Sequence, residues 1–186
     1  CSSDLKQLLP IYDKPLIYYP LSVLMLAGIR DILIIVNKGA INQFKKILEN
    51  GENFGVKIKY LEQTKPSGLP DAFKIGKNFI AKDNVSLILG DNFFYGQSLS
   101  EKLKNISKLK RGATILVHPV SNPKQFGVAT IKNKKIIKLE EKPNITKSNL
   151  AVTGLYFFDN SVVKKVTKLK KSKRKEYEII DLLKLY

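Results

Sequence analysis

The residues best suited to chemistry in this 186-residue sequence follow short apolar runs, where the carboxyl ends of parallel strands would form one ligand-binding edge of a sheet. Asp91 and Asn92 come directly after the run at 85–90. A carboxylate at such a strand end is a good ligand for Mg²⁺, which completes its shell with phosphate oxygens and water. The alternative is an ordinary turn in which Asp91 accepts a hydrogen bond from the backbone.

A second strand end carries polar groups after the run at 56–61. Gln63 is followed by a loop that contains Pro66 and Gly68. An amide side chain and free backbone N–H groups of this kind could bind a planar heterocycle. A plain loop between a strand and a helix is the simpler interpretation of the same residues.

The segment "LEEKP" at 139–143 ends a third extended run with two carboxylates and a lysine. The period of two along a strand sends Glu140 and Lys142 to one face and Glu141 to the other, unless the strand ends there. Taken alone, the segment is most simply a surface strand end.

Other chemistries find little support in these residues. The single histidine, His118, lies within an apolar strand and is expected in the core or at a sheet edge. The sequence has no G-x-S-x-G elbow, no Walker loop and no G-x-G-x-x-G fingerprint. Serine or cysteine nucleophiles, zinc and dinucleotide binding are therefore not expected, and the remaining chemistry is one that needs no general base.

The elements that must position these residues alternate along the first two thirds of the chain. Short β-branched runs and helical segments predict a Rossmann-like three-layer α/β/α fold with a doubly wound, mostly parallel sheet. The expected strands are 31–36, 56–61, 85–90 and 113–120, and the expected helices are 15–28, 41–51, 69–80 and 98–109. In the first helix, Ile17, Leu21, Leu24 and Leu26 are expected near one buried face.

The rhythm changes after residue 120. Three extended runs, at 126–132, 134–143 and 149–159, are separated by few residues, with Asn133 and Lys134 at a tight turn. They predict a β-hairpin insertion beside the parallel sheet, followed by helices at 160–169 and 176–186. We expect a single domain over residues 1–186.

Composition limits the partners. The 33 basic residues exceed the 16 acidic ones and give a net charge of +17, yet only three are arginines, the residue favoured for bidentate phosphate and base contacts. Nucleic-acid binding is therefore not expected, whereas an anionic small ligand is compatible with the charge. No apolar run is long enough to span a membrane, and a lone cysteine without a cationic leader fits a reducing cytoplasm.

Five segments together resemble the sugar-nucleotide pyrophosphorylases, and among them the thymidylyltransferase branch. They are "KQLLPIYDKPLIYYPLSVLMLAGIRDILII" (6–35), "GLPDAF" (68–73), "LGDNFFYG" (89–96), "LEEKP" (139–143) and "SNLAVTGLYFFD" (148–159). The resemblance implies that a phosphate oxygen of glucose 1-phosphate attacks the α-phosphate of dTTP, forming dTDP-glucose and pyrophosphate with Mg²⁺ as cofactor. It also implies a homotetramer, with a nucleotide-binding part at 1–120 and a sugar-phosphate-binding part at 121–186.

The resemblance also implies roles for individual residues. Asp91 would bind Mg²⁺, and Lys6, Asp91 and Lys142 would be the catalytic residues. Nucleotide binding would fall to Lys6, Gln7, Gln63, Gly68 and Asp91. Sugar-phosphate binding would fall to Asn92, Gly127, Glu141, Lys142, Val152, Tyr156 and Arg174.

The chain departs from the family pattern in ways that bear on activity. A glycine-rich G-x-G-T-R loop is expected before Lys6, and a second metal-binding aspartate is expected beyond Tyr186, so we expect the sequence to be a piece of a longer protein and nearly inactive by itself. Phe126 stands where the family has tyrosine, and Lys175 where it has glycine. Two alternatives stay open: a UTP-dependent uridylyltransferase and a non-catalytic sugar-nucleotide-binding domain.

Overall fold

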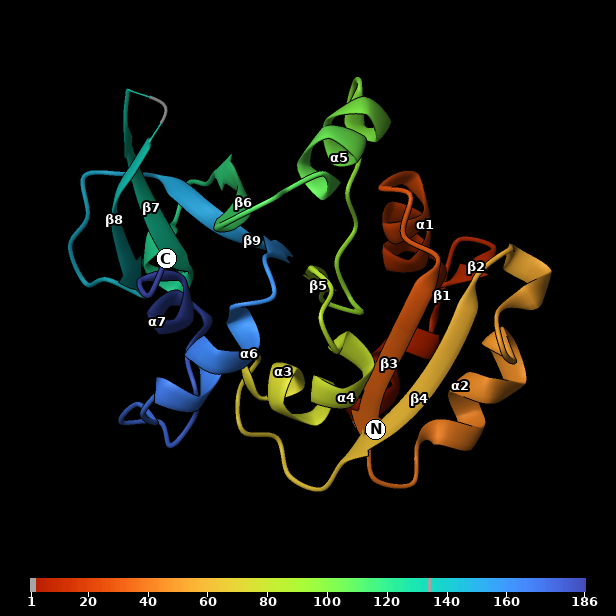
Figure 1. Cartoon of the computed structure of the whole chain (residues 1–186). Helices are drawn as coiled ribbons and strands as arrows, with labels where there is room; N and C mark the ends of the chain where they lie inside the picture. The colour runs from red at the N-terminus through yellow and green to blue at the C-terminus, as the bar shows by residue number, and fades with distance from the viewer. Residues whose placement is uncertain (1–2, 134) are drawn as a thin grey trace.

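The computed structural model describes residues 3–133 and 135–186 and has mixed α/β architecture (Figure 1). In its first half, the strands are β1 (Pro10–Ile11), β2 (Lys14–Pro15), β3 (Asp31–Asn37), β4 (Lys57–Gln63) and β5 (Val85–Ile88). The helices there are α1 (Tyr18–Leu26), α2 (Ile41–Leu48), α3 (Asp71–Ile75), α4 (Lys77–Ile80) and α5 (Leu99–Ser107). Short 3₁₀ turns occupy η1 (Ser3–Leu8) and η2 (Glu52–Phe54).

The second half continues with four strands and short helices. The strands are β6 (Ala113–Pro119), β7 (Gly127–Lys132), β8 (Lys135–Glu141) and β9 (Leu150–Phe158). The helices are α6 (Val162–Lys165) and α7 (Ile179–Leu183), with 3₁₀ turns η3 (Pro123–Gln125) and η4 (Val166–Lys168). Among the described residues, no helix is long and apolar enough to cross a membrane.

Strands β3 and β4 pair in parallel, as the alternation predicts. Their register runs from Asp31 opposite Lys57 to Asn37 opposite Gln63, so the last residues of the two strands lie side by side. Helix α2 lies beside this pair in Figure 1, and Phe44 and Leu48 of α2 are buried in a cluster with Ile32 of β3. The pairing therefore places the two polar side chains at one end of the sheet.

The remaining large strands form a five-stranded sheet whose pairs, over the described residues, are antiparallel. Both β5 and β6 run antiparallel to β9. They are consequently parallel to each other, with β9 between them. The predicted α/β class and hairpin are present, but the hairpin and the third extended run are strands of the same sheet as β5 and β6.

The burial of β9 explains this difference. Seven of its nine residues are buried, with a pattern that covers both faces of the strand. A strand that is apolar on both faces gains most in the middle of a sheet, where elements cover each side. Because β9 follows residue 120 and pairs with strands that precede it, the two predicted parts of the domain share one sheet.

The β7–β8 hairpin projects at the far side of the molecule from β3 and β4 (Figure 1). Asn133 in its turn has a φ of +50°, a left-handed conformation that asparagine tolerates better than most residues. Lys134, predicted at the same turn, lies outside the described residues.

Helix α1 joins two buried clusters. Leu21 and Leu24 pack with β3 and α2, whereas Val23 and Ala27 pack with Leu103 of α5 and with β9. The expectation that Leu26 shares the buried face is wrong, since this side chain is 40% exposed. A helix that packs on two sides buries neighbouring residues, so a single 3.6-residue stripe does not describe it.

Between β3 and β5 the structure is hollow. Over the described residues, β3 pairs only with β4, and β5 pairs only with β9. Two cavities of about 530 Å³ and 700 Å³ are each lined by residues of both strands, from Ile32 to Ile35 on one side and at Leu87 and Ile88 on the other. The smaller cavity also reaches Asn37, Gln63 and Gly90, at the carboxyl ends of the strands.

Candidate functional site

An ion pair lies immediately after β5. Lys6 Nζ pairs with Asp91 Oδ2, and Asn92 Nδ2 donates to Asp91 Oδ1 at 3.1 Å. The lysine lies in η1, which is fixed by the Ile17 N–H donating to the Gln7 carbonyl oxygen at 2.8 Å. The carboxylate of Asp91 thus faces a cation and an amide at the edge of the sheet.

The pKa of Asp91 is lowered. Burial acts in the opposite direction, but the hydrogen bond and charge of Lys6, the amide of Asn92 and the backbone N–H of Asp91 together outweigh it. The carboxylate is therefore ionised at neutral pH and able to attract a cation.

The three other residues predicted at the nucleotide share one cavity. Gln7, Gln63 and Gly68 line the space of about 530 Å³ beside Asn37 and Gly90. Gln63 Nε2 donates to Asn37 Oδ1 at 2.8 Å, which orients the amide at the end of β4. The cavity combines an apolar wall with a few fixed polar groups, the usual make-up of a small-molecule site.

Gln7 has an unsatisfied hydrogen-bond acceptor inside this cavity. Its Oε1 atom is buried and accepts no hydrogen bond from the residues that the structure describes. The side chain lies close against Gly90, where a Cβ would sit 3.1 Å from Gln7 Cγ. A buried acceptor without a donor costs about 1–3 kcal/mol, so a ligand N–H at this point would be favoured.

Gly68 touches the loop that carries Arg174. Its φ is +99°, and a Cβ there would collide with the Tyr177 carbonyl oxygen and lie 2.8 Å from the Tyr177 nitrogen. The Tyr177 N–H donates to the Ser67 carbonyl oxygen at 2.8 Å. This backbone contact joins the loop predicted to bind the nucleotide to the loop predicted to bind the sugar phosphate.

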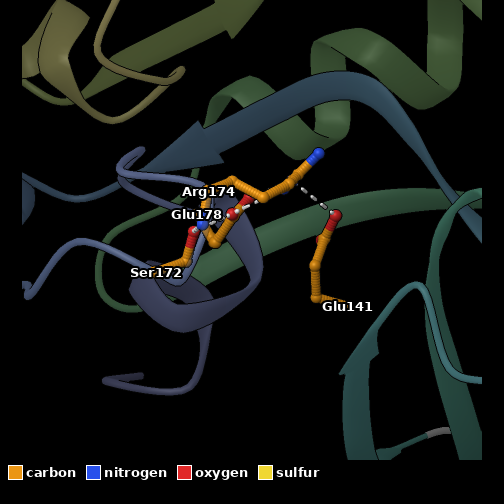
Figure 2. A network of polar contacts seen from close by, with 4 residues as sticks. All are labelled: Glu141, Ser172, Arg174 and Glu178. Carbon is orange, nitrogen blue, oxygen red and sulfur yellow. Dashed lines mark hydrogen bonds and ion pairs between the residues drawn. The ribbon is translucent and has the colours of Figure 1, made fainter.

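Glu141, the last residue of β8, and three residues that precede α7 form a polar network (Figure 2). Arg174 donates to Glu178 through Nε at 3.2 Å and through Nη2 at 2.7 Å. The same Nη2 atom lies 3.4 Å from Glu141 Oε1, and Ser172 Oγ donates to Glu178 Oε1 at 2.6 Å. The network therefore brings two of the predicted sugar-phosphate residues, Glu141 and Arg174, into contact.

The network changes the ionisation of its neighbours. Burial and the charge of Glu178 raise the pKa of Glu141, against the charges of Arg174 and Lys142. Burial, with a contribution from Glu141, raises the pKa of Tyr156 to about 12. The tyrosine hydroxyl therefore keeps its proton at neutral pH and can act as a donor.

The hairpin supplies Gly127 and Lys142. Gly127 lies opposite Glu141, and a Cβ on it would fall 2.6 Å from Ile180 Cδ1. Strand β8 ends at Glu141, and Lys142 follows with a φ of +42° while its N–H donates to the Phe126 carbonyl oxygen at 3.0 Å. The strand ends before Lys142, which is the case excepted from the period-two placement, and this side chain is exposed.

Strand β9 lies between the residues around Asp91 and those around Glu141. Val152 and Tyr156 are buried on it, and a Cβ on Gly154 would lie 2.8 Å from the amide of Asn92. Asn92 is therefore fitted against β9 while it holds Asp91. His118, by contrast, is exposed on β6, which pairs only with β9 among the described residues, so it lies at a sheet edge and not in the core.

The donor set limits metal binding. Over residues 3–133 and 135–186, no group of three or more histidine, cysteine, aspartate or glutamate side chains is arranged to hold an ion. Asp91 offers one ionised carboxylate beside a cavity, which suits Mg²⁺ only where phosphate oxygens and water complete its shell.

The sequence interpretation missed Glu178, Ser172 and Asn37. Glu178 stands four residues after Arg174, a spacing that favours ion pairs on helices and could have indicated their contact. Asn37 ends β3 as Gln63 ends β4, so the parallel register could have indicated their contact.

Comparisons of sequence and structure with known proteins all identify nucleotidyl transferases as the similar proteins. Residues 2–186 match the model of the nucleotidyl transferase family. The chain is 53% identical over 182 residues to a glucose-1-phosphate thymidylyltransferase of Neisseria meningitidis and 48% identical to one of Mycolicibacterium smegmatis. Each match covers 97% of this chain and 63% of the relative, so the chain spans less than two thirds of their length.

A solved structure resembles the fold closely. A provisionally assigned glucose-1-phosphate thymidylyltransferase from Bacillus anthracis, crystallised with sucrose, superposes with a TM-score of 0.88 at 38% identity. The match covers 97% of this chain and 73% of that one. The α/β fold class predicted from the sequence is confirmed.

Replacing Gly68 with alanine tests the contact between the two loops. An alanine at a left-handed φ costs about 1–2 kcal/mol by itself, and at Gly68 the clash with Tyr177 adds to it. Gly112→Ala is the matched control, because its φ is +96° and no atom lies within 4 Å of the added Cβ. Urea unfolding of the full-length protein should show a larger loss for Gly68→Ala, and equal losses would contradict the contact.

Glu141→Gln should stabilise the protein at neutral pH. A raised carboxyl pKa means that the folded state holds the proton more tightly, so stability falls as pH rises above the usual glutamate value of about 4.3. Urea unfolding should therefore favour the variant at pH 7 and not below pH about 4. The control is Glu140→Gln, which should show no such gain, because the Glu140 carboxylate pairs with Lys138. If Glu141→Gln stabilised the protein equally at every pH, the raised pKa of Glu141 would not be the cause.

Proposed function

The chain belongs to the nucleotidyl transferase family, and we propose that the protein is a glucose-1-phosphate thymidylyltransferase, which forms dTDP-glucose and pyrophosphate from dTTP and glucose 1-phosphate. One observation carries the proposal: the Lys6–Asp91 pair borders the cavity that holds Gln7 and Gln63, and the backbone of Tyr177 joins this cavity to the Arg174–Glu141 pair. Two anionic substrates need two such cationic positions.

The nucleotide would lie in the cavity of about 530 Å³. Thymine presents an N3–H donor between two carbonyl acceptors, and the buried Oε1 of Gln7 is an acceptor in need of a donor. Gln63, oriented by Asn37, and the backbone at Gly68 would complete recognition of the base edge. Lys6 would offset the charge of the triphosphate.

The sugar phosphate would lie against the hairpin and α7. Glu141 would accept hydrogen bonds from the hexose hydroxyls, and Tyr156, with its pKa of about 12, would remain a donor. Arg174 and the exposed Lys142 would hold the phosphate. Asn92 and the backbone at Gly127 and Val152 would supply further sugar contacts.

The chemistry requires no proton transfer from the attacking group. A phosphate oxygen of glucose 1-phosphate, already anionic, would form a bond to the α-phosphorus, while the bond to the pyrophosphate oxygen breaks and its electron pair leaves with pyrophosphate. The work of the protein is to bring two anions together in line and to neutralise charge as it moves. Lys6, Lys142 and Arg174 suit that task.

Asp91 would hold Mg²⁺ together with phosphate oxygens of the nucleotide. The ion would polarise the α-phosphate and neutralise charge on the leaving pyrophosphate. Lys6, which pairs with the same carboxylate, would neutralise charge on the phosphates. By the same resemblance, the enzyme would be a cytoplasmic homotetramer.

Two other functions remain candidates on particular observations. The Gln7 and Gln63 amides would suit uracil as well as thymine, which keeps a UTP-dependent uridylyltransferase open. A non-catalytic sugar-nucleotide-binding domain would need no metal centre, and the described residues hold no group of three or more side chains arranged for one. Neither explains the close sequence similarity to thymidylyltransferases as simply.

Asp91→Asn tests the catalytic assignment in the full-length protein. With dTTP, glucose 1-phosphate and Mg²⁺, pyrophosphate release should fall at least about a hundredfold, the loss expected for a major electrostatic stabiliser. Asp83→Asn changes an exposed aspartate outside the site and should leave the rate intact. Retained activity in Asp91→Asn would show that Asp91 is not a catalytic residue.

The same assay compares nucleotides. The ratio kcat/KM for dTTP should exceed that for UTP, because the proposal rests on similarity to thymidylyltransferases. A preference for UTP would replace the proposal with uridylyl transfer, and binding of dTDP-glucose without turnover would replace it with a binding domain.

A further inference from the structure

Glu178 is a buried residue whose two carboxylate oxygens both accept hydrogen bonds. It is 8% exposed and is the one charged residue buried among those that the structure describes. Oε1 accepts from Ser172 Oγ at 2.6 Å and from Arg174 Nε at 3.2 Å, and Oε2 accepts from Arg174 Nη2 at 2.7 Å. A buried charge persists only when it is paired and hydrogen-bonded in this way.

Two carboxylates compete for one guanidinium. Glu178 takes two donors of Arg174 in a fork, whereas Glu141 lies 3.4 Å from one of them (Figure 2). A forked contact fixes both the position and the plane of the guanidinium. The longer contact to Glu141 is consequently the weaker of the two.

The loop is built around the same carboxylate. The Arg174 N–H donates to Ser172 Oγ at 3.2 Å, while the Ser172 hydroxyl donates to Glu178. The Lys175 N–H donates to the Ser172 carbonyl oxygen at 2.9 Å, and the Ser172 N–H donates to the Glu176 carbonyl oxygen at 2.8 Å. Arg174 thus leaves a tight turn whose side-chain support comes from Glu178.

We propose that Glu178 is a positioning residue for the sugar-phosphate site. It holds Nε and Nη2 of Arg174 so that Nη1, which donates to none of the described residues, faces the phosphate. It also limits the contact between Arg174 and Glu141 to the longer one at 3.4 Å, which leaves the Glu141 carboxylate able to accept sugar hydroxyls. This inference rests on the proposed function, because it assigns Arg174 and Glu141 to the sugar phosphate.

Glu178→Gln in the full-length enzyme separates positioning from support of the fold. The KM for glucose 1-phosphate should rise about tenfold, or about 1.4 kcal/mol, while the KM for dTTP stays within about twofold. A purely structural role would act through the adjoining Tyr177 backbone, which contacts Gly68, and would raise both values together. Glu140→Gln is the control and should change neither.

A double-mutant cycle tests whether Glu178 acts through Arg174. In an Arg174→Lys background, which lacks the fork, Glu178→Gln should add little to the KM for glucose 1-phosphate. Additive effects would overturn the inference. Ser172→Ala preserves the charge and removes one hydroxyl, so it should give a smaller rise, about two- to threefold, in the same KM even where Glu178→Gln folds poorly.

The outcomes distinguish this inference from the proposed function. Wild-type enzyme without dTDP-glucose formation would overturn both. Wild-type turnover with an unchanged KM in Glu178→Gln, or with equal rises for both substrates, would overturn the positioning role alone.

Discussion

The site depends on carboxylates that hold cations in fixed places. The protein carries 33 basic residues, and charge alone distinguishes none of them. Lys6 and Arg174 differ because each pairs with a carboxylate at the border of the site, Asp91 after β5 and Glu178 before α7. An ordered cation meets a phosphate at a smaller entropic cost than a free surface lysine does, so position, more than net charge, makes these two residues useful.

Backbone contacts then link the two regions that are proposed to bind the substrates. The Tyr177 N–H bonds to Ser67, and the absence of a side chain at Gly68 permits the approach. Three residues earlier in the same segment, Arg174 meets Glu178. A shift of this loop would therefore disturb both regions together, whereas a change confined to the Glu178 side chain would disturb one. Because close-packed groups transmit strain, a displacement at one of these contacts is passed to its neighbours.

Local patterns predicted much of this arrangement and failed where distant contacts decide. Apolar runs identified β3 to β6 because strand hydrophobicity is a property of the run itself. The place of β9 between β5 and β6 depends on pairing partners more than 30 residues away in sequence, which no period records. Glu178 was missed for a similar reason: its burial requires Arg174 and Ser172 to turn back onto it. Gly127 is needed because Ile180 packs against it from another element.

Nucleotide choice must arise from features other than the two amides. Thymine and uracil present the same N3–H and carbonyl groups, so Gln7 and Gln63 would bind both equally. The 5-methyl group of thymine would contribute about 1–3 kcal/mol through apolar contacts of the kind that Leu69 and Leu89 provide in this cavity. That range corresponds to a preference of about 10- to 200-fold. A ratio above it would require exclusion of the ribose 2′-hydroxyl as well, whereas a ratio near one would mean that the methyl group remains in water.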